Sequence, residues 1–159
     1  MKVLVTGGCG FIGVHACEFF CRQGWAVIAY DNMTKFELDR TGYRADAARD
    51  YNWNWLGELG VERVIGDIRD LEQILDCSSG CDFIVHTAAQ QAVTISIEEP
   101  LVDLKTNVLG TVHVLEAARK HSIPADSRQP LAMSASDILP KWRIVTSSFV
   151  ISFTGTRLK

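Results

Sequence analysis

The order of apolar and polar residues at the start of the chain predicts a strand, a loop, a helix and a second strand. Residues 2–5 form a short run with β-branched members that ends at two glycines. In residues 11–22, apolar side chains recur at helical spacing. Residues 26–29 are apolar without alternation, which is typical of a parallel strand covered on both faces. The first 30 residues therefore predict part of a buried sheet.

The same alternation continues over about two-thirds of the chain. Residues 61–65 and 83–85 repeat the unbroken apolar character of a covered strand, and helix-like segments follow at 70–75 and 101–120. Strands that alternate with helices make a parallel sheet, because parallel neighbours need crossover connections and these are right-handed. We therefore expect an α/β fold, a doubly wound parallel sheet of the Rossmann type, with residues 1–124 as one domain.

Three glycines lie between the first predicted strand and the first predicted helix. Gly7, Gly10 and Gly13 stand in the segment TGGCGFIG, where the first two are one residue further apart than in the common dinucleotide fingerprint. Glycine at these positions allows a tight turn, a close approach of backbone to a pyrophosphate and close packing of helix on strand. The N-terminus of the following helix offers free N–H groups to phosphates. An accidental glycine turn is the plain alternative.

An acidic residue at the end of the second predicted strand favours the dinucleotide interpretation. Asp31 follows Gly13 by 18 residues. A carboxylate at this place accepts hydrogen bonds from both ribose hydroxyls and repels a 2′-phosphate. The combination predicts NAD as the cofactor, in preference to NADP.

Two further motifs follow predicted strands, at the edge where open parallel sheets form ligand crevices. Asp67 is placed to face an adenine amino group and Ile68 to pack on the ring, although Asp67 would serve equally well as a helix cap. Ala88 and Ala89 let the chain pass close to a cofactor, but an ordinary tight turn would also suit them. We interpret the neighbouring His86 as a packed, hydrogen-bonded residue and not as a proton shuttle.

Composition and charge narrow the class of protein. The chain of 159 residues is 47% hydrophobic and 22% charged, with a formal net charge of −3, which gives no basic surface for nucleic acid. No apolar stretch approaches the about 20 residues that span a bilayer, and the chain enters a strand pattern without a signal peptide. We expect a cytoplasmic protein with neither nucleic acid nor a membrane as partner. The chain has five cysteines, and no histidine lies at zinc-site spacing from them. They are Cys9, Cys17, Cys21, Cys77 and Cys81. We expect these cysteines to be free thiols, and we expect no metal site.

Five motifs occur in the order seen in extended short-chain dehydrogenases, the family of nucleotide-sugar epimerases and dehydratases. They are TGGCGFIG at 6–13, DN at 31–32, GDIRD at 66–70, HTAAQ at 86–90 and NVLGT at 107–111. The chain resembles this family over about residues 1–124, and segments 51–56 and 90–100 are most similar to its CDP-paratose 2-epimerase branch. The resemblance implies an NAD site lined by Gly7, Gly10, Phe11, Ile12, Gly13, Asp31, Asn32, Asp67, Ile68, Ala88, Ala89, Gln90 and Asn107.

The resemblance also implies a chemistry that needs residues beyond the NAD site. In this family, NAD takes a hydride from a sugar carbon, and a tyrosine acts as acid and base with its pKa lowered by a lysine four residues later. None of the tyrosines in this sequence has that lysine. Tyr30, Tyr43 and Tyr51 are followed at this spacing by Thr34, Ala47 and Trp55. We therefore assign no catalytic residue.

Residues 125–159 form an atypical tail that does not continue the family pattern. Residues 125–142 are polar and interrupted by proline, whereas residues 143–148 resemble one added strand, near 143–150, with Ser148 as a candidate for the family serine. We expect a truncated chain without the family's C-terminal substrate domain, such as a frameshift or an early stop would leave. Its uncovered sheet edge would favour homo-oligomers, and a nucleotide sugar such as a CDP-sugar would bind weakly if at all.

Three functions remain open at this point. The first, which we favour, is the NAD-binding N-terminal portion of a nucleotide-sugar epimerase or dehydratase that is inactive alone. The second is an active epimerase that takes catalytic residues from another chain, or uses Ser148 with a nonstandard base. The third is a non-enzymatic NAD-binding or interaction module. Turnover of a nucleotide sugar separates the second function from the others.

Overall fold

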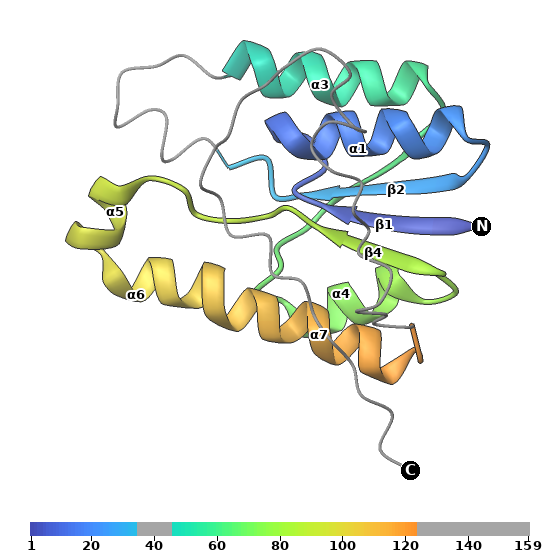
Figure 1. Cartoon of the computed structure of the whole chain (residues 1–159). Helices are drawn as coiled ribbons and strands as arrows, with labels where there is room; N and C mark the ends of the chain where they lie inside the picture. The colour runs from blue at the N-terminus through green and yellow to red at the C-terminus, as the bar shows by residue number, and fades with distance from the viewer. Residues whose placement is uncertain (35–45, 124–159) are drawn as a thin grey trace.

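A parallel sheet of four strands forms the centre of the structure, a computed structural model that describes residues 1–34 and 46–123 (Figure 1). The strands are β1 (Lys2–Thr6), β2 (Ala26–Asp31), β3 (Glu62–Ile65) and β4 (Phe83–His86), in the spatial order β3-β2-β1-β4. Val3 of β1 pairs with Val27 on one side and with Phe83 on the other. The strand order reverses beside β1, as in a doubly wound sheet, so the predicted fold class is confirmed.

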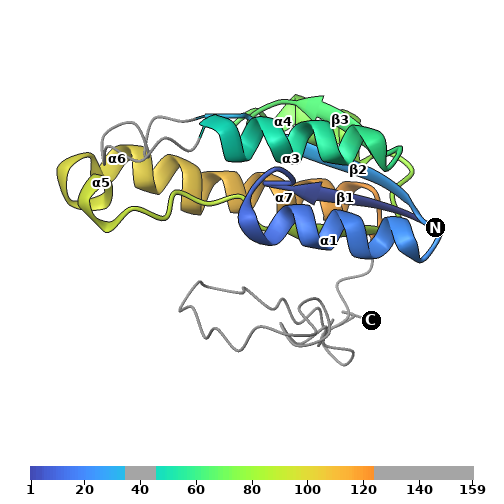
Figure 2. The ribbon, with the colours of Figure 1, turned by 90° about the horizontal axis from the view of Figure 1, so that it is seen from above.

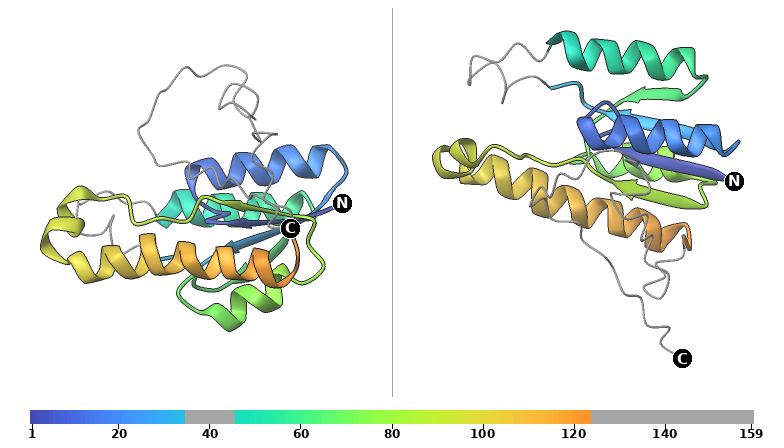
Figure 3. Two further views of the ribbon diagram at one scale, coloured as in Figure 1. Left: turned by 60° about the horizontal axis from the view of Figure 1, so that its bottom comes forward. Right: turned by 45° about the horizontal axis from the view of Figure 1, so that its top comes forward.

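Helices cover both faces of this sheet (Figure 3). On one face lie α1 (Phe11–Arg22) and α3 (Asp46–Glu58), and on the other lie α4 (Leu71–Ser78) and α7 (Gly110–Lys120). Successive side chains of a strand point to opposite faces, so each strand serves two cores. Val3 and Val5 face α1, whereas Leu4 between them faces α4 and α7. This alternation explains why the central strands read as unbroken apolar runs.

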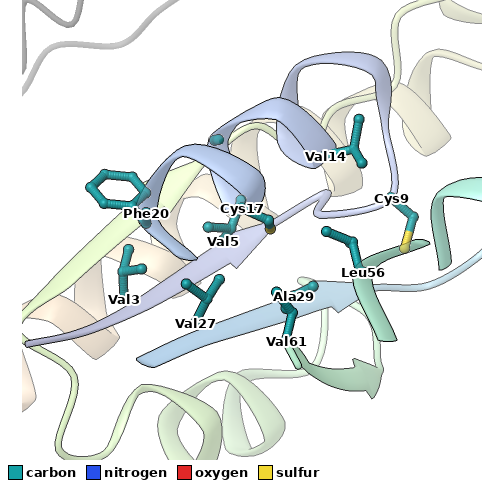
Figure 4. Packing of buried hydrophobic residues seen from close by; sticks show 11 residues of the cluster. Val3, Val5, Cys9, Val14, Cys17, Phe20, Val27, Ala29, Leu56 and Val61 are labelled. Carbon is teal, nitrogen blue, oxygen red and sulfur yellow. The ribbon is translucent and has the colours of Figure 1, made fainter. Parts of the chain in front are cut away.

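The core between the sheet and α1 is closely packed. Phe20 of α1 and Leu56 of α3 are buried together with Val3 and Val27 of the sheet (Figure 4). Leu56 has no exposed surface, so α3 is held firmly against this face. The packing fixes α1 and α3 relative to the carboxyl ends of β1 and β2, where the candidate site lies.

The chain after β4 extends beyond the sheet before it returns. It forms α5 (Val93–Glu98), α6 (Pro100–Asp103), the π-helical turn η1 (Leu104–Leu109) and then α7. α5 and α6 lie beyond the carboxyl ends of the strands, and the helix that ends as α7 runs back along the sheet (Figures 1 and 2). The helix predicted over residues 101–120 is present, with a π turn inside it, a feature frequent at functional sites.

β3 is more exposed to solvent than the apolar pattern of residues 61–65 predicted. Glu62, Arg63 and Ile65 are exposed, Ile65 with 64% of its surface accessible. The reason is topological, because within residues 1–34 and 46–123 β3 pairs with β2 alone and forms an edge of the sheet. The Arg63 guanidinium lies 5.0 Å from the centre of the Trp53 ring of α3, and charges at such an edge discourage pairing with other chains.

Among the described residues, no helix has both the length and the apolar character required to cross a membrane. The predicted tail of residues 125–159, with its candidate strand and Ser148, lies outside the described residues, as does Tyr43.

Candidate functional site

The loop between β1 and α1 is fixed at the carboxyl edge of the sheet by its own backbone. The Gly7 N–H donates to the Tyr30 carbonyl oxygen at 2.8 Å, and the Gly10 N–H donates to the Gly7 carbonyl oxygen at 2.9 Å. Gly7 has a φ of 69°, in the left-handed region that favours glycine. The chain therefore turns sharply from β1 into α1, as the glycine spacing predicted.

The three glycines of this loop are needed for different reasons. A Cβ atom on Gly7 would lie 2.7 Å from the backbone nitrogen of Ala88, and one on Gly13 would lie 2.0 Å from the Gly7 oxygen. These two glycines let parts of the protein approach one another. Among the described residues, a Cβ atom on Gly10 would meet a single atom within 4 Å, the Gly7 oxygen at 3.1 Å. In that part of the chain, the other side of Gly10 is open space.

The N-terminus of α1 is suited to an anion. Gly10 is its N-cap residue and makes no side-chain capping bond, and the first turn has no acidic residue. Phe11 and Ile12 begin the helix and are 70% and 42% exposed. The first N–H groups of a helix lack acceptors within the helix and lie at the positive end of its dipole. With the open space beside Gly10, this loop fits a pyrophosphate.

Asp31 ends β2 and lies directly beside the loop. Its Oδ2 accepts a hydrogen bond from the Cys9 N–H at 3.0 Å, and its Oδ1 accepts one from the Met33 N–H at 2.8 Å. The residue is 4% exposed. A carboxylate oxygen accepts two hydrogen bonds, so among the described residues Oδ2 retains capacity for a hydroxyl. The structure thus brings Asp31 and the glycine loop together, as the sequence predicted.

Two residues of α3 complete this corner, and the sequence analysis missed both. Arg49 Nη1 lies 3.2 Å from Asp31 Oδ1, and Asn52 Nδ2 donates to the Cys9 carbonyl oxygen at 2.9 Å. The signal that could have found them is their spacing from Leu56, because residues four and seven positions apart share a helix face. Leu56 is the buried residue that turns this face toward the sheet.

The thiols near this corner have raised pKa values and are therefore poorly reactive. Burial, together with the Asp31 charge, raises the pKa of Cys9 to about 12, and burial also raises the pKa of Cys17. All five cysteines lie within the described residues and are free. In that part of the chain, no group of three or more histidine, cysteine, aspartate or glutamate side chains is arranged to hold a metal.

Asp67 and Asn32 are brought together on the β3 side of the edge. Asn32 Nδ2 donates to Asp67 Oδ2 at 3.3 Å, and the Arg69 guanidinium donates to both oxygens of the same carboxylate. The Arg69 bonds lower the pKa of Asp67 to about 2. The N-cap of α4 is Asp70, which accepts from the Gln73 N–H at 3.2 Å. Asp67 is therefore an ionised acceptor at the edge and not the cap of this helix.

Ile68 lies beneath α7 and not at the surface. It is 5% exposed, and a Cβ atom on Gly110 would lie 2.5 Å from its Cδ1. Its carbonyl oxygen lies 3.0 Å from His113 Nδ1. The Ile68 side chain thus packs in the core between sheet and α7.

Asn107, in the π turn, holds the segment that follows β4. Its Oδ1 accepts from the Gln90 N–H at 2.8 Å, and its Nδ2 donates to the Gln90 carbonyl oxygen at 2.9 Å. Gln90 is buried, whereas Ala89 beside it is exposed, and the Ala88 backbone lies against Gly7. The predicted residues of this segment do lie together at the edge of the sheet. The side-chain amide of Asn107, however, is hydrogen-bonded to the Gln90 backbone and not directed at a ligand.

His86 joins β1, β4 and α7. Thr6 Oγ1 lies 2.7 Å from Nδ1, and Thr111 Oγ1 lies 3.1 Å from Nε2. Because Thr111 Oγ1 donates its proton to the Asn107 carbonyl oxygen at 2.7 Å, it accepts from Nε2–H, and Nδ1 accepts from Thr6. Burial lowers the pKa of His86 to about 4. The prediction of a packed, hydrogen-bonded histidine is confirmed.

Comparison with known proteins places this arrangement among related sequences. A family model described as GDP-mannose 4,6 dehydratase matches residues 4–138. The CDP-paratose 2-epimerase of Salmonella typhi is 38% identical over 125 residues, which are 77% of this chain and 34% of that protein. A dTDP-glucose 4,6-dehydratase of Mycobacterium tuberculosis is 32% identical over 123 residues, again 77% and 34%. The chain spans about a third of the length of these relatives.

Solved structures show the same likeness in three dimensions. A UDP-glucose 4-epimerase of Stenotrophomonas maltophila, with bound NAD and formylated UDP-arabinopyranose, matches with a TM-score of 0.63 at 30% identity, over 77% of this chain and 34% of that one. The Thermus thermophilus UDP-glucose 4-epimerase in complex with NAD matches with a TM-score of 0.58 at 33% identity, over 77% and 35%. The resemblance inferred from the five sequence motifs is confirmed.

Proposed function

Because this chain belongs to the GDP-mannose 4,6 dehydratase family, we propose that its glycine loop and the neighbouring strand ends bind NAD. Two similar structures contain NAD, and the residues of this chain fit that molecule. The first N–H groups of α1 would hold the pyrophosphate, Asp31 the adenosine ribose, and Asn32 with Asp67 the adenine. These contacts bind and orient the cofactor.

The observation that carries the proposal is the open space at Gly10. Packing within the protein explains why Gly7 and Gly13 are glycines, because a side chain at either position would collide with backbone atoms. Gly10 has a weaker structural reason, since within the described residues its Cβ would touch a single atom, the Gly7 oxygen at 3.1 Å. A glycine that faces open space at the N-terminus of an uncapped helix is what close approach of a pyrophosphate requires.

The cofactor is NAD in preference to NADP in this proposal. Asp31 is fixed by two backbone N–H groups, so its charge cannot easily turn away from a ligand at the loop. A hydroxyl can donate to this carboxylate, whereas a 2′-phosphate would be repelled by it.

For the whole chain, we propose the NAD-binding N-terminal portion of a nucleotide-sugar epimerase or dehydratase that is inactive alone. NAD, when bound, supplies a hydride acceptor for a sugar carbon. None of the tyrosines in these 159 residues is followed four positions later by a lysine, so no side chain is assigned to hold the hydroxyl proton. We expect a CDP-sugar or another nucleotide sugar to bind weakly, and the five free thiols suit a reducing cytoplasm.

The test is calorimetric titration of NAD into the unmodified chain and into Gly10→Val. The variant should keep the helix content of the unmodified chain and lose little in melting temperature, because among the described residues its Cβ would meet a single atom, the Gly7 oxygen at 3.1 Å, which must shift by only a few tenths of an ångström. Its NAD affinity should fall by about tenfold to a hundredfold, since charge-assisted hydrogen bonds to the phosphates are lost.

Gly13→Ala provides the matched comparison. It places a methyl group against the Gly7 carbonyl, so it should lower the melting temperature as well as NAD affinity. A folded Gly10→Val chain with undiminished NAD affinity would show that the phosphates bind elsewhere.

A further inference from the structure

The segment that follows β4 has backbone groups without a partner in the described part of the chain. The Thr87 N–H still donates to the Thr6 carbonyl oxygen of β1, at 3.0 Å. Within the described residues, the backbone N–H and carbonyl groups of Ala88 and Ala89 make no hydrogen bond. Ala88 lies against Gly7 of the glycine loop, and Ala89 is exposed. Backbone polar groups need partners, so these groups suit water or a ligand at this edge.

These groups lie where the second half of a dinucleotide would extend. Asp31 ends β2 and Asp67 follows β3, whereas Ala88 and Ala89 follow β4. In the spatial order β3-β2-β1-β4, the glycine loop after β1 lies between these two sets of residues. With the adenosine half at the ends of β2 and β3 and the pyrophosphate at the loop, the nicotinamide half would extend toward the end of β4.

Gln90 holds this segment through both its backbone and its side chain. The Asn107 amide accepts from the Gln90 N–H at 2.8 Å and donates to the Gln90 carbonyl oxygen at 2.9 Å. The buried Gln90 side chain donates from Nε2 to Ser96 Oγ at 3.1 Å. Because Gln90 is fixed at both ends, the two residues before it are restrained as well.

A single carboxylate oxygen joins the two partners of Gln90. Asp103 Oδ1 accepts from Ser96 Oγ at 2.8 Å and from Asn107 Nδ2 at 2.9 Å. A flipped Asn107 amide would bring its oxygen against this carboxylate, so Asp103 decides which way the amide points. Asp103 ends α6, directly before the π turn that contains Asn107.

We propose that Asp103 is a positioning residue for the nicotinamide half of a bound NAD. It acts through Asn107 and Ser96, and so holds the backbone groups of Ala88 and Ala89 in place for the ligand. The inference rests on the proposed NAD site. A segment that is ordered before binding loses less conformational freedom when the ligand binds, so the affinity is higher.

The experiment is a calorimetric titration of NAD and of ADP into the unmodified chain and into Asp103→Ala. ADP contains the adenosine and the pyrophosphate but not the nicotinamide riboside, so its binding reports on the glycine loop and on correct folding. In Asp103→Ala, NAD affinity should fall by about threefold to tenfold and ADP affinity by less than about twofold, since one or two hydrogen bonds are lost on the β4 side alone.

Three further variants distinguish positioning from a general loss of packing. Asp103→Asn keeps the Oδ1 acceptor and should retain most of the NAD affinity. Ser96→Ala removes one of the two partners and should lower NAD affinity in the same direction as Asp103→Ala, but by less; it carries the comparison if Asp103→Ala does not fold. Lys105→Ala changes an exposed residue of the same π turn. As the matched control, it should bind both ligands as the unmodified chain does.

The outcomes separate this inference from the proposed function. Equal losses of NAD and ADP affinity in Asp103→Ala, or an unchanged NAD affinity in the folded variant, would refute the positioning role and leave the NAD site standing. If the unmodified chain binds neither ligand, the proposed function fails and this inference fails with it.

Discussion

Acid should destabilise this fold through His86, the half-buried imidazole that joins β1, β4 and α7. Burial lowers its pKa from 6.5 to about 4 in the folded chain. The unfolded chain therefore binds this proton more readily, so the stability due to His86 is full above pH 6.5 and is lost as the pH falls toward 4. Each pH unit in that window removes about 1.4 kcal/mol, so the free energy of unfolding should fall by about 2 kcal/mol between pH 7.5 and 5.0.

Urea unfolding followed by tryptophan fluorescence, at pH 7.5 and 5.0 and constant ionic strength, measures this difference. His86→Gln should lose most of it, because glutamine does not titrate. His15→Gln, which removes a histidine from the surface of α1, is the matched control and should keep it. The low pKa of Asp67, about 2, makes its contribution present above pH 3.8 and lost only below, outside this window. An equal loss of stability in His86→Gln and the unmodified chain would refute the assignment to His86.

Two further predictions concern packing and turnover. Gly66→Ala should lower the free energy of unfolding by about 1–3 kcal/mol, because its Cβ would lie 2.4 Å from the fully buried Tyr30 ring. Gly110→Ala should cost less in the same urea titration, because the atom it meets is the flexible end of Ile68 and alanine favours the helix. The 159-residue chain saturated with NAD should not epimerise CDP-paratose, CDP-tyvelose or UDP-sugars, since acid–base catalysis alone contributes about a hundredfold to ten-thousandfold. Chromatography of the product sugars would detect multiple turnovers, which would contradict the inactive assignment.

The parts of the fold that follow from local apolar spacing could be predicted closely. The helix expected over residues 11–22 has those bounds in α1, because its buried residues recur at helical spacing. α3 was not predicted, since its apolar and polar side chains do not separate clearly onto opposite helix faces. Leu56 is buried against the sheet, with Trp53 and Trp55 packed beside the same core. The exposure of β3 also could not be predicted, because an apolar run does not say whether its strand lies at the centre or the edge of a sheet.

The candidate site likewise contains residues that the local sequence reveals and contacts that depend on tertiary packing. Gly7 is recognisable in the sequence because a left-handed φ is a property of one residue, and Asp31 because it ends a strand at a known distance from the loop. The contact between Arg49 and Asp31 crosses 18 positions and that between Asn52 and Cys9 crosses 43. Both contacts depend on how α3 packs, which no spacing in the motif encodes. The glycine spacing and Asp31 could therefore be recognised from the sequence, whereas the α3 side chains that contact them could be identified only in the structure.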